Sequence, residues 1–254
     1  MHLAVILRLI PDLSEELEID DSGTDIDREW IGFKLNEFDD QALEEAVLLK
    51  ERFGARVTAM ALTAEGSDRI LQTAVARGAD EALRIDHDEE RVDSATKAAS
   101  LLAGALAEIG ATLVLTGVQT PEDVFGQLAP TLAGRLGWPT VNAVSSVSMQ
   151  DGKVVVRQEY SGGLSALLQV SGPAVLGIQA ASQPPRYVSG TKLRQAQSTP
   201  IRSIRAGAAA ASAAKIASLD VPERSSHAEM LSGDANSVAA RVLNILRERG
   251  LAGA

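Results

Sequence analysis

Two hydrophobic periods alternate along the first two-thirds of the chain. Continuous apolar runs of strand length are separated by longer segments in which apolar residues recur every three to four positions, as on one side of a helix. The predicted strands are residues 3–7, 56–62, 82–85 and 112–116. The predicted helices are residues 36–53, 67–77, 94–109 and a fourth that begins between 126 and 130 and ends at Gly137. This alternation is typical of a parallel sheet with right-handed crossovers.

The predicted helix over residues 36–53 has recognisable ends. Asn36 is expected as its N-cap and Gly54 as its C-terminal stop. Its apolar stripe consists of Ala42, Ala46, Leu49 and Phe53. Glu44 and Glu45 fall outside this stripe, so we expect their carboxylates to lie on a solvated face of the helix.

The pattern changes after residue 140. Four β-like segments lie at 141–147, 153–160, 165–170 and 174–178, with turn-forming pairs at 151–152 and 162–163. This order predicts a β-meander or a pair of hairpins. Beyond residue 180 the regular pattern fades, and the alanine-rich residues 206–214 are expected to form a flexible tether or a helical turn.

The last part of the chain carries a clear amphipathic helical pattern over residues 237–249. Its apolar side consists of Val238, Val242, Ile245 and Leu246. This helix lies beyond the segments that make up the predicted core, so we expect it to dock either on its own domain or on a partner protein.

Charge and residue content narrow the classes of function. The chain has 254 residues and a net charge of −10, which argues against binding to nucleic acid or to an anionic membrane surface. It has no cysteine and three widely spaced histidines, so a disulfide, a catalytic thiolate and a metal site are not expected. The apolar runs are shorter than the roughly 20 residues of a membrane span, and no signal-peptide pattern is visible. We therefore expect a cytoplasmic protein.

Three loops are expected at the carboxyl edge of the predicted sheet, where open α/β sheets bind ligands: residues 7–12, 62–67 and 117–127. In the third loop, Gly117 and Gly126 permit close approach of backbone, and the amides at the start of the following helix suit a phosphate. Asp123 would repel a phosphate, so it is expected to cap the helix or to bind a sugar hydroxyl. The alternative is that residues 117–127 are simply a long capped loop.

Known catalytic motifs are absent. The chain lacks the G-x-G-x-x-G fingerprint, the Walker lysine motif and G-x-S-x-G. Residues 160–165 superficially resemble a serine nucleophile site, but a hairpin turn explains their glycines better. Residues 86–90 combine four carboxylates with His87 and resemble a metal cluster, although a solvated loop is the favoured interpretation. No catalytic residue is therefore assigned, and the pattern indicates a nucleotide-holding protein without its own catalytic machinery.

Several short strings, in their order and spacing, carry a resemblance to a known family. They are residues 35–39, 42–47, 73–80, 117–127, 136–139, 162–164 and 185–187. With them the chain resembles the beta subunit of electron transfer flavoprotein over nearly its full length. Residues 8–12 and 127–130 look more like the bacterial, nitrogen-fixation-associated (Fix-type) branch than the mitochondrial one.

The resemblance implies an electron carrier rather than an enzyme. It implies an α/β fold with a Rossmann-like parallel sheet and flanking helices, a β-hairpin extension and a C-terminal arm helix. Residues 1–185 would form the adenine-nucleotide-binding domain, and residues 186–254 a docking loop, a linker and an arm that packs on the partner. That partner would be an alpha subunit, which holds most of a shared FAD.

The resemblance also implies that the beta subunit holds a structural AMP, or a second FAD in electron-bifurcating relatives. The residues that match this pocket by position are Ile6, Leu7, Asn36, Asp39, Leu62, Thr63, Gly117, Asp123, Val124, Gly126, Gln127 and Leu128. An asparagine and a threonine of the family pattern are replaced here by Gly126 and Leu128, so phosphate would depend more on backbone amides. Residues 122–125 lack the Asp-Gly-Asp-Thr string of the bifurcating branch, which favours AMP. A tyrosine that approaches the flavin in the mitochondrial form is Leu13 here.

The family docks on flavin dehydrogenases of the acyl-CoA dehydrogenase type, as in fatty acid oxidation, and passes the electrons to a quinone-linked or other acceptor. The matching docking residues are Arg186, Tyr187, Val188, Gly190 and Leu193. The position of the family's exposed apolar anchor is Gly190, so Leu193 or Val188 would have to replace it. Two other classes share the α/β pattern: a homodimeric adenine-nucleotide-binding protein like the universal stress proteins, and an ATP-using ligase or pyrophosphatase. The first does not explain the residues after 162, and the second needs a glycine-serine phosphate loop that residues 8–12 lack.

Overall fold

The structure, a computed structural model, describes residues 1–89, 91–123, 125–212, 216–222 and 228–252. By their contacts, residues 1–218 form one unit and residues 219–254 a second. Three features named above lie wholly or partly outside the described residues: Glu90, Val124 and the end of the 206–214 connector.

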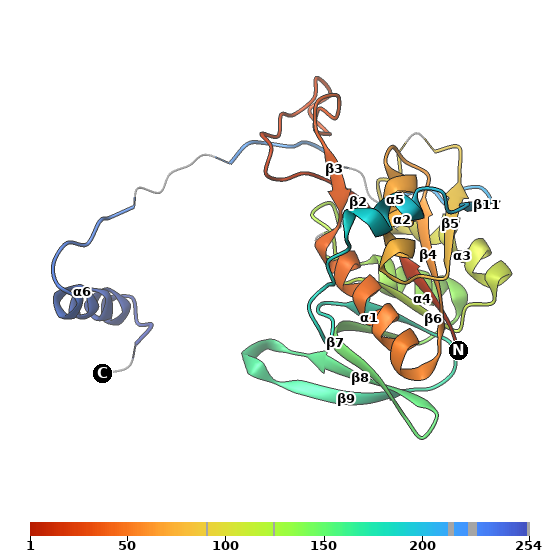
Figure 1. Cartoon of the computed structure of the whole chain (residues 1–254). Coiled ribbons are helices and arrows are strands. Elements are labelled where there is room, and N and C mark those ends of the chain that lie inside the picture. Colours follow the sequence, from red (N-terminus) through yellow and green to blue (C-terminus); the bar gives the residue numbers. More distant parts are fainter. Residues whose placement is uncertain (90, 124, 213–215, 223–227, 253–254) are drawn as a thin grey trace. The chain divides into compact units, whose positions relative to one another are not determined.

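A nine-stranded sheet in the order β11-β5-β4-β1-β6-β10-β7-β8-β9 runs through the described part of the first unit (Figure 1). Six of its strands are β1 (His2–Ile6), β4 (Arg56–Leu62), β5 (Glu81–Asp86), β6 (Leu113–Gly117), β10 (Ala174–Ile178) and β11 (Arg202–Arg205). The other three are β7 (Thr140–Gln150), β8 (Lys153–Glu159) and β9 (Ser165–Val170). A separate antiparallel pair consists of β2 (Leu9–Pro11) and β3 (Phe33–Leu35).

Helices cover both faces of the parallel strands. The helices are α1 (Glu37–Phe53), α2 (Ser67–Arg77), α3 (Ala95–Ile109), α4 (Leu128–Leu136) and α5 (Gly190–Ala196). Side chains alternate along each strand, so Leu3 and Val5 of β1 pack on α1 and α2, whereas Ala4 and Ile6 pack on α3 and α4. These two buried apolar clusters, one on each face, fix the register of the central strands. The prediction of an α/β fold with a mostly parallel sheet is confirmed.

The β-rich segment differs from the prediction in one strand. β7, β8 and β9 pair antiparallel, as the meander predicted. The fourth segment, β10, instead returns to the centre and pairs parallel with β6 and β7, and a short 3₁₀ turn at Ser161–Gly163 joins β8 to β9. All five residues of β10 are buried, which is typical of a strand covered on both faces.

Two short elements lie beyond residue 180, where no regular pattern was predicted. α5 packs on α2, and β11 pairs with β5 at the edge of the sheet. Residues 186–205 therefore group with the first unit, while the expected packing of the later residues on a partner remains a prediction.

The second unit contains α6 (Ala235–Glu248), where the terminal helix was predicted. Asp234 caps it, because its Oδ1 accepts a hydrogen bond from the Ser237 amide at 2.8 Å. No residue of α6 is buried, and Val242, Leu243 and Leu246 are exposed along its apolar side. Among the described residues, none of the helices combines the length and the apolar character that crossing a membrane requires.

Candidate functional site

The carboxyl edge of the parallel sheet has a topological switch point beside β1. The chain leaves β1 through α1 to reach β4 on one side, and later returns through α3 to β6 on the other side. Because β4, β1 and β6 are adjacent and parallel, the loops that follow them lie at one edge. Open α/β sheets bind ligands in the crevice at such a point.

A buried ion pair lies at this switch point. Asp39, in the first turn of α1, is fully buried, and Arg8 follows β1. The Asp39 carboxylate accepts hydrogen bonds from the Arg8 backbone amide at 3.0 Å, from Nε at 2.9 Å and from Nη2 at 2.9 Å. A carboxylate that accepts several charge-assisted bonds is held in one orientation, so the start of α1 is fixed relative to β1.

Gly117 completes this arrangement from the end of β6. Its amide donates to Asp39 Oδ1 at 2.5 Å, and its carbonyl accepts from Arg8 Nη2 at 2.8 Å. A Cβ at this position would lie 2.6 Å from the Asp39 amide nitrogen and from Oδ1. The predicted close approach of backbone at Gly117 is therefore present, and it serves the contact between α1 and β6.

Asn36 stands at the predicted start of α1, but its side chain does not cap the helix. Its Nδ2 donates instead to the carbonyl of Gln119 at 2.9 Å, and its amide donates to the carbonyl of Arg8 at 2.9 Å. The N-cap prediction is thus correct for position and wrong for the side chain, because the Gln119 carbonyl in the loop after β6 accepts the bond of the Asn36 amide group.

The loop of residues 117–127 is ordered by Asp123. Its carboxylate accepts hydrogen bonds from the amides of Gln127 at 2.9 Å and Leu128 at 3.2 Å, which are at the start of α4. This is the predicted capping role. The same two amides were expected to help bind a phosphate, so a phosphate at this helix end would have to share them with a carboxylate.

The other described residues that were predicted to bind the nucleotide differ in how far they are exposed to solvent. Four are buried: Ile6, Leu7, Gly126 and Leu128. Leu62 is half-buried, and Thr63 and Gln127 are exposed. The Thr63 hydroxyl donates to Asp86 Oδ1 at 2.8 Å, and Asn142 Nδ2 donates to the Gly126 carbonyl at 3.2 Å.

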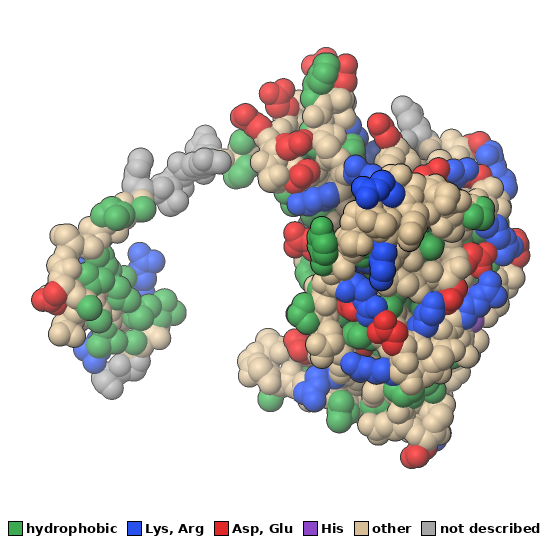
Figure 2. Space-filling view, viewed as in Figure 1, with side chains coloured by type: hydrophobic (Ala, Val, Ile, Leu, Met, Phe, Trp, Pro, Cys, Tyr) green, Lys and Arg blue, Asp and Glu red, His purple; other side chains and the backbone are tan. Residues whose placement is uncertain are grey.

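Four charged side chains join three loops above the crevice. Asp25 and Arg28 come from the loop between β2 and β3, Arg91 from the loop before α3, and Glu122 from the loop before α4. Arg28 Nη2 lies 2.5 Å from Glu122 Oε1 and its Nε lies 3.1 Å from Asp25, while Arg91 pairs with both acids. Burial alone would raise the pKa of Asp25, but hydrogen bonds from Arg28 and from a backbone amide hold it below its usual value. Figure 2 shows the acidic side chains gathered over the β2–β3 loop.

The expectation that Glu44 and Glu45 lie on a solvated face of the helix is wrong, because both side chains are buried. Glu45 accepts hydrogen bonds from the amides of Val147 at 2.6 Å and Ser182 at 2.7 Å. Glu44 binds the Arg186 guanidinium at 2.9 Å. Segments distant in sequence supply these partners, so the helical pattern of residues 36–53 alone gave no sign of them.

The predicted docking residues follow these contacts. Arg186 bridges Glu44 and Glu51, and the two carboxylates raise its pKa. Tyr187 is 93% exposed, whereas Val188 is 8% exposed. Gly190 begins α5 and Leu193 is half-buried within it. Val188 is therefore unsuited to be an exposed anchor. The side chain of Tyr187 is far more accessible than that of Val188.

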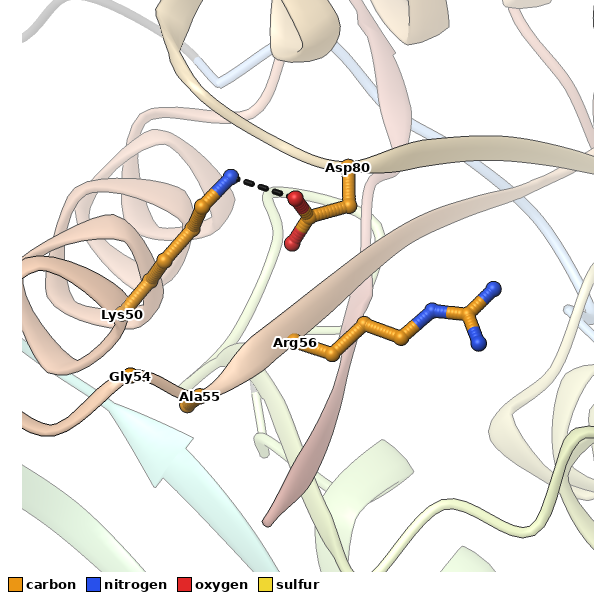
Figure 3. Close-up of a pocket in the computed structure, with 5 residues that line it drawn as sticks. All are labelled: Lys50, Gly54, Ala55, Arg56 and Asp80. Atoms are coloured by element: carbon orange, nitrogen blue, oxygen red, sulfur yellow. Dashed lines mark hydrogen bonds and ion pairs between the residues drawn. The ribbon is translucent and has the colours of Figure 1, made fainter.

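Two surface depressions lie away from the crevice. One, of about 400 Å³, is lined by Lys50, Gly54, Ala55, Arg56 and Asp80 at the opposite, amino edge of β4 (Figure 3). Its charges are paired, since Lys50 Nζ lies 2.6 Å from Asp80 Oδ1. The other, of about 350 Å³, lies between β3, α1 and α2 and includes Arg69 and Arg77. Neither lining includes a predicted nucleotide residue, although Leu35, Glu37 and Asp40 of the second depression flank Asn36 and Asp39 in the sequence.

The two motifs that resembled chemistry lie in connections between elements. Residues 160–165 form the tight connection between β8 and β9, where the Tyr160 amide donates to the Leu164 carbonyl at 2.9 Å. Asp86 and Asp88 are paired with arginines, and the described residues contain no group of three metal-ligating side chains.

The fold defines a class: an α/β protein with a mostly parallel sheet and a topological switch point beside β1. Comparison with known proteins gives the family. The electron transfer flavoprotein domain matches residues 25–223. The chain is 29% identical over 262 residues to the electron transfer flavoprotein subunit beta of Methylophilus methylotrophus, covering 98% of both chains. It is 30% identical over 225 residues to that of Syntrophomonas wolfei, covering 87% of both.

The chain belongs to the electron transfer flavoprotein family, as a beta subunit. The resemblance given by the short strings is confirmed. Membership assigns the chain to electron transport in a flavoprotein.

Proposed function

We propose that the chain pairs with an alpha subunit, completes the site of its FAD and holds an adenine nucleotide in its own crevice. The observation that supports the proposal is the Arg8–Asp39–Gly117 network, which joins β1, α1 and β6 at the switch point where α/β sheets bind ligands. These three groups are engaged with each other and not with a nucleophile, so the site is built for holding rather than for reaction.

The crevice residues fit the adenosine part of the nucleotide best. Leu62 is partly buried on the α3 and α4 side of the sheet and provides apolar surface against which a purine can pack, with the buried Ile6 and Leu128 behind it in the same apolar cluster. Asp123 keeps free lone pairs that can accept from ribose hydroxyls while it caps α4. When bound, the flavin supplies the electron transfer, and this chain's residues orient the nucleotide and exclude water.

Two apolar surfaces support the need for a partner subunit. On the β-hairpin extension, Tyr160, Leu164 and Leu167 are 53%, 70% and 66% exposed. On α6, Val242, Leu243 and Leu246 are exposed, and the described residues of the second unit do not bury them. Exposed apolar groups of this size mark protein interfaces. We propose that both surfaces bind the alpha subunit.

The electron donor is proposed to be a flavin dehydrogenase of the acyl-CoA dehydrogenase type, and the acceptor a quinone-linked or other redox protein. The segment after Pro185 supports this proposal because the Glu44–Arg186–Glu51 contacts hold Tyr187 outward. An exposed tyrosine on a fixed backbone is a common interface anchor.

The test is to copurify the chain with its partner, denature the complex and identify the released nucleotides. We expect one FAD and one AMP per heterodimer. A colourless, stable homodimer that hydrolyses ATP would refute the electron-carrier proposal, and two FADs would replace AMP by a second flavin. A control complex carrying Ser145→Ala, a change on β7, should release the same nucleotides as the wild type.

A further inference from the structure

His87 is half-buried, and its imidazole nitrogens have no hydrogen-bond partner among the described residues. It directly follows β5, at the same carboxyl edge of the sheet as the crevice. Both ring nitrogens, Nδ1 and Nε2, are shielded from solvent and make no hydrogen bond. Its neighbour Asp86 is different, because that carboxylate binds Thr63 and Arg84.

The alternation along β5 gives the direction of the imidazole. Leu83 and Ile85 belong to the buried cluster that faces α3 and α4. His87 directly follows the last residue of β5, and continuing the alternation of the strand by one residue would put it in the row of Leu83 and Ile85, with Asp86 in the row of the opposite face. Ile6 and Leu62, at the ends of β1 and β4, belong to the same cluster as Leu83 and Ile85, as does Leu128 in the first turn of α4. His87 therefore lies on the face that carries the apolar residues of the crevice.

A buried polar group without a partner costs about 1–3 kcal/mol, so native proteins rarely keep one that has no use. A neutral imidazole offers one donor and one acceptor. The edge of an adenine ring carries both kinds of group, and apolar side chains such as Ile6 and Leu62 suit its faces. The position thus combines apolar walls with an unused hydrogen-bonding group.

We propose that His87 binds the base of the nucleotide through a hydrogen bond from or to one of its ring nitrogens. This inference rests on the proposed adenine-nucleotide crevice and adds the residue that recognises the base. In the sequence, His87 stands within an acidic run. The pattern of residues 86–90 does not reveal that its ring nitrogens are shielded from solvent.

The test compares His87→Phe, which keeps a ring and removes both nitrogens, with Ser145→Ala. Ser145 Oγ is also buried without a partner, but it lies on β7. Each variant is copurified with the alpha subunit, freed of nucleotide and titrated with AMP and with ribose 5-phosphate by equilibrium dialysis. His87→Phe should weaken AMP binding about 5- to 10-fold, the equivalent of one neutral hydrogen bond, and leave ribose 5-phosphate binding unchanged. Ser145→Ala should change neither.

A second readout separates binding from packing. Without nucleotide, His87→Phe should unfold at the same urea concentration as the wild type or at a higher one, because it removes an unpaired polar group. Unchanged AMP affinity in His87→Phe, or an equal loss for AMP and ribose 5-phosphate, would overturn the inference. If the wild-type complex binds no adenine nucleotide at all, the proposed function fails as well, and that outcome is visible before any variant is made.

Discussion

The buried pair of Arg8 and Asp39 gives the sharpest test of how the crevice is built. Asp39 is fully buried, and the Arg8 side chain is 17% exposed. Asp39→Ala would remove the carboxylate and leave a largely buried guanidinium and the Gly117 amide without their acceptor. Breaking one side of a buried pair costs about 3–5 kcal/mol, most of which is the penalty of the charge left behind.

A double variant separates the penalty of the unpaired charge from the contribution that the ion pair itself makes to the free energy of unfolding. Arg8→Met combined with Asp39→Leu removes both charges and keeps much of the volume, so we expect it to be less destabilised than Asp39→Ala alone. Urea unfolding followed by circular dichroism measures the free energies. The surface pair of Lys34 and Asp12 provides the control, since Asp12→Ala breaks an exposed pair and should cost at most about 1 kcal/mol.

The reasoning is refuted if Asp39→Ala costs no more than Asp12→Ala. It is also refuted if the effects of Arg8→Met and Asp39→Leu add without coupling, because residues in one hydrogen-bonded network should couple by at least about 0.5 kcal/mol. Either result would mean that the crevice is held by the apolar clusters alone.

Three further predictions concern single positions. Gly117→Ala should lower the free energy of unfolding by about 1–3 kcal/mol, because the added Cβ would lie 2.6 Å from the backbone of α1. Gly104→Ala is the control in the same urea assay: it has open space around it in α3 and should be neutral or stabilising. Asp123→Ala should cost about 1 kcal/mol through loss of the α4 cap, and Asp123→Asn should restore most of it; equal losses would mean that capping is not the cause. Burial would raise the pKa of Asp80, but hydrogen bonds from Lys50 and the Val57 amide hold it below its usual value of 3.8. The wild type should therefore be more stable than Asp80→Asn near pH 6. This difference in the free energy of unfolding should shrink as the pH falls below about 3.8. A difference that grows in acid would contradict this.

Most of the elements were predictable because their signals are local. The ends of α1, α3 and α4 are marked by Gly54, Gly110 and Gly137, each with a positive φ that suits glycine at a helix end. The strands were visible as continuous apolar runs, which is what a sheet covered on both faces requires. α5 and β11 were not visible, since seven and four residues are too short to show a period.

The contacts at the carboxyl edge of the sheet were less predictable than the edge itself. The strand order indicated which loops meet there, and the structure places Gly117 at that edge with Asp39 of α1 against it, while nucleotide binding at this edge remains a prediction. The acceptor role of Glu45 was missed because its partner Ser182 is 137 residues away in the sequence. Arg8 was noted only as part of a short string, although its guanidinium links three segments of the crevice. The hydrophobic pattern reveals the period within one segment, but it does not reveal which distant segments are in contact.

The acidic side chains of α1 connect two distant parts of the first unit. Asp39 ties the first turn of α1 to the crevice, and Glu44 and Glu51, further along the same helix, hold Arg186 in the segment that exposes Tyr187. A helix of 17 residues with both ends fixed by charge-assisted bonds relates the two places rigidly. Electron transfer through a bound flavin needs fixed distances rather than acid–base chemistry. The carboxylates of α1 are therefore better explained as tethers between the nucleotide crevice and the docking segment than as a solvated helix face.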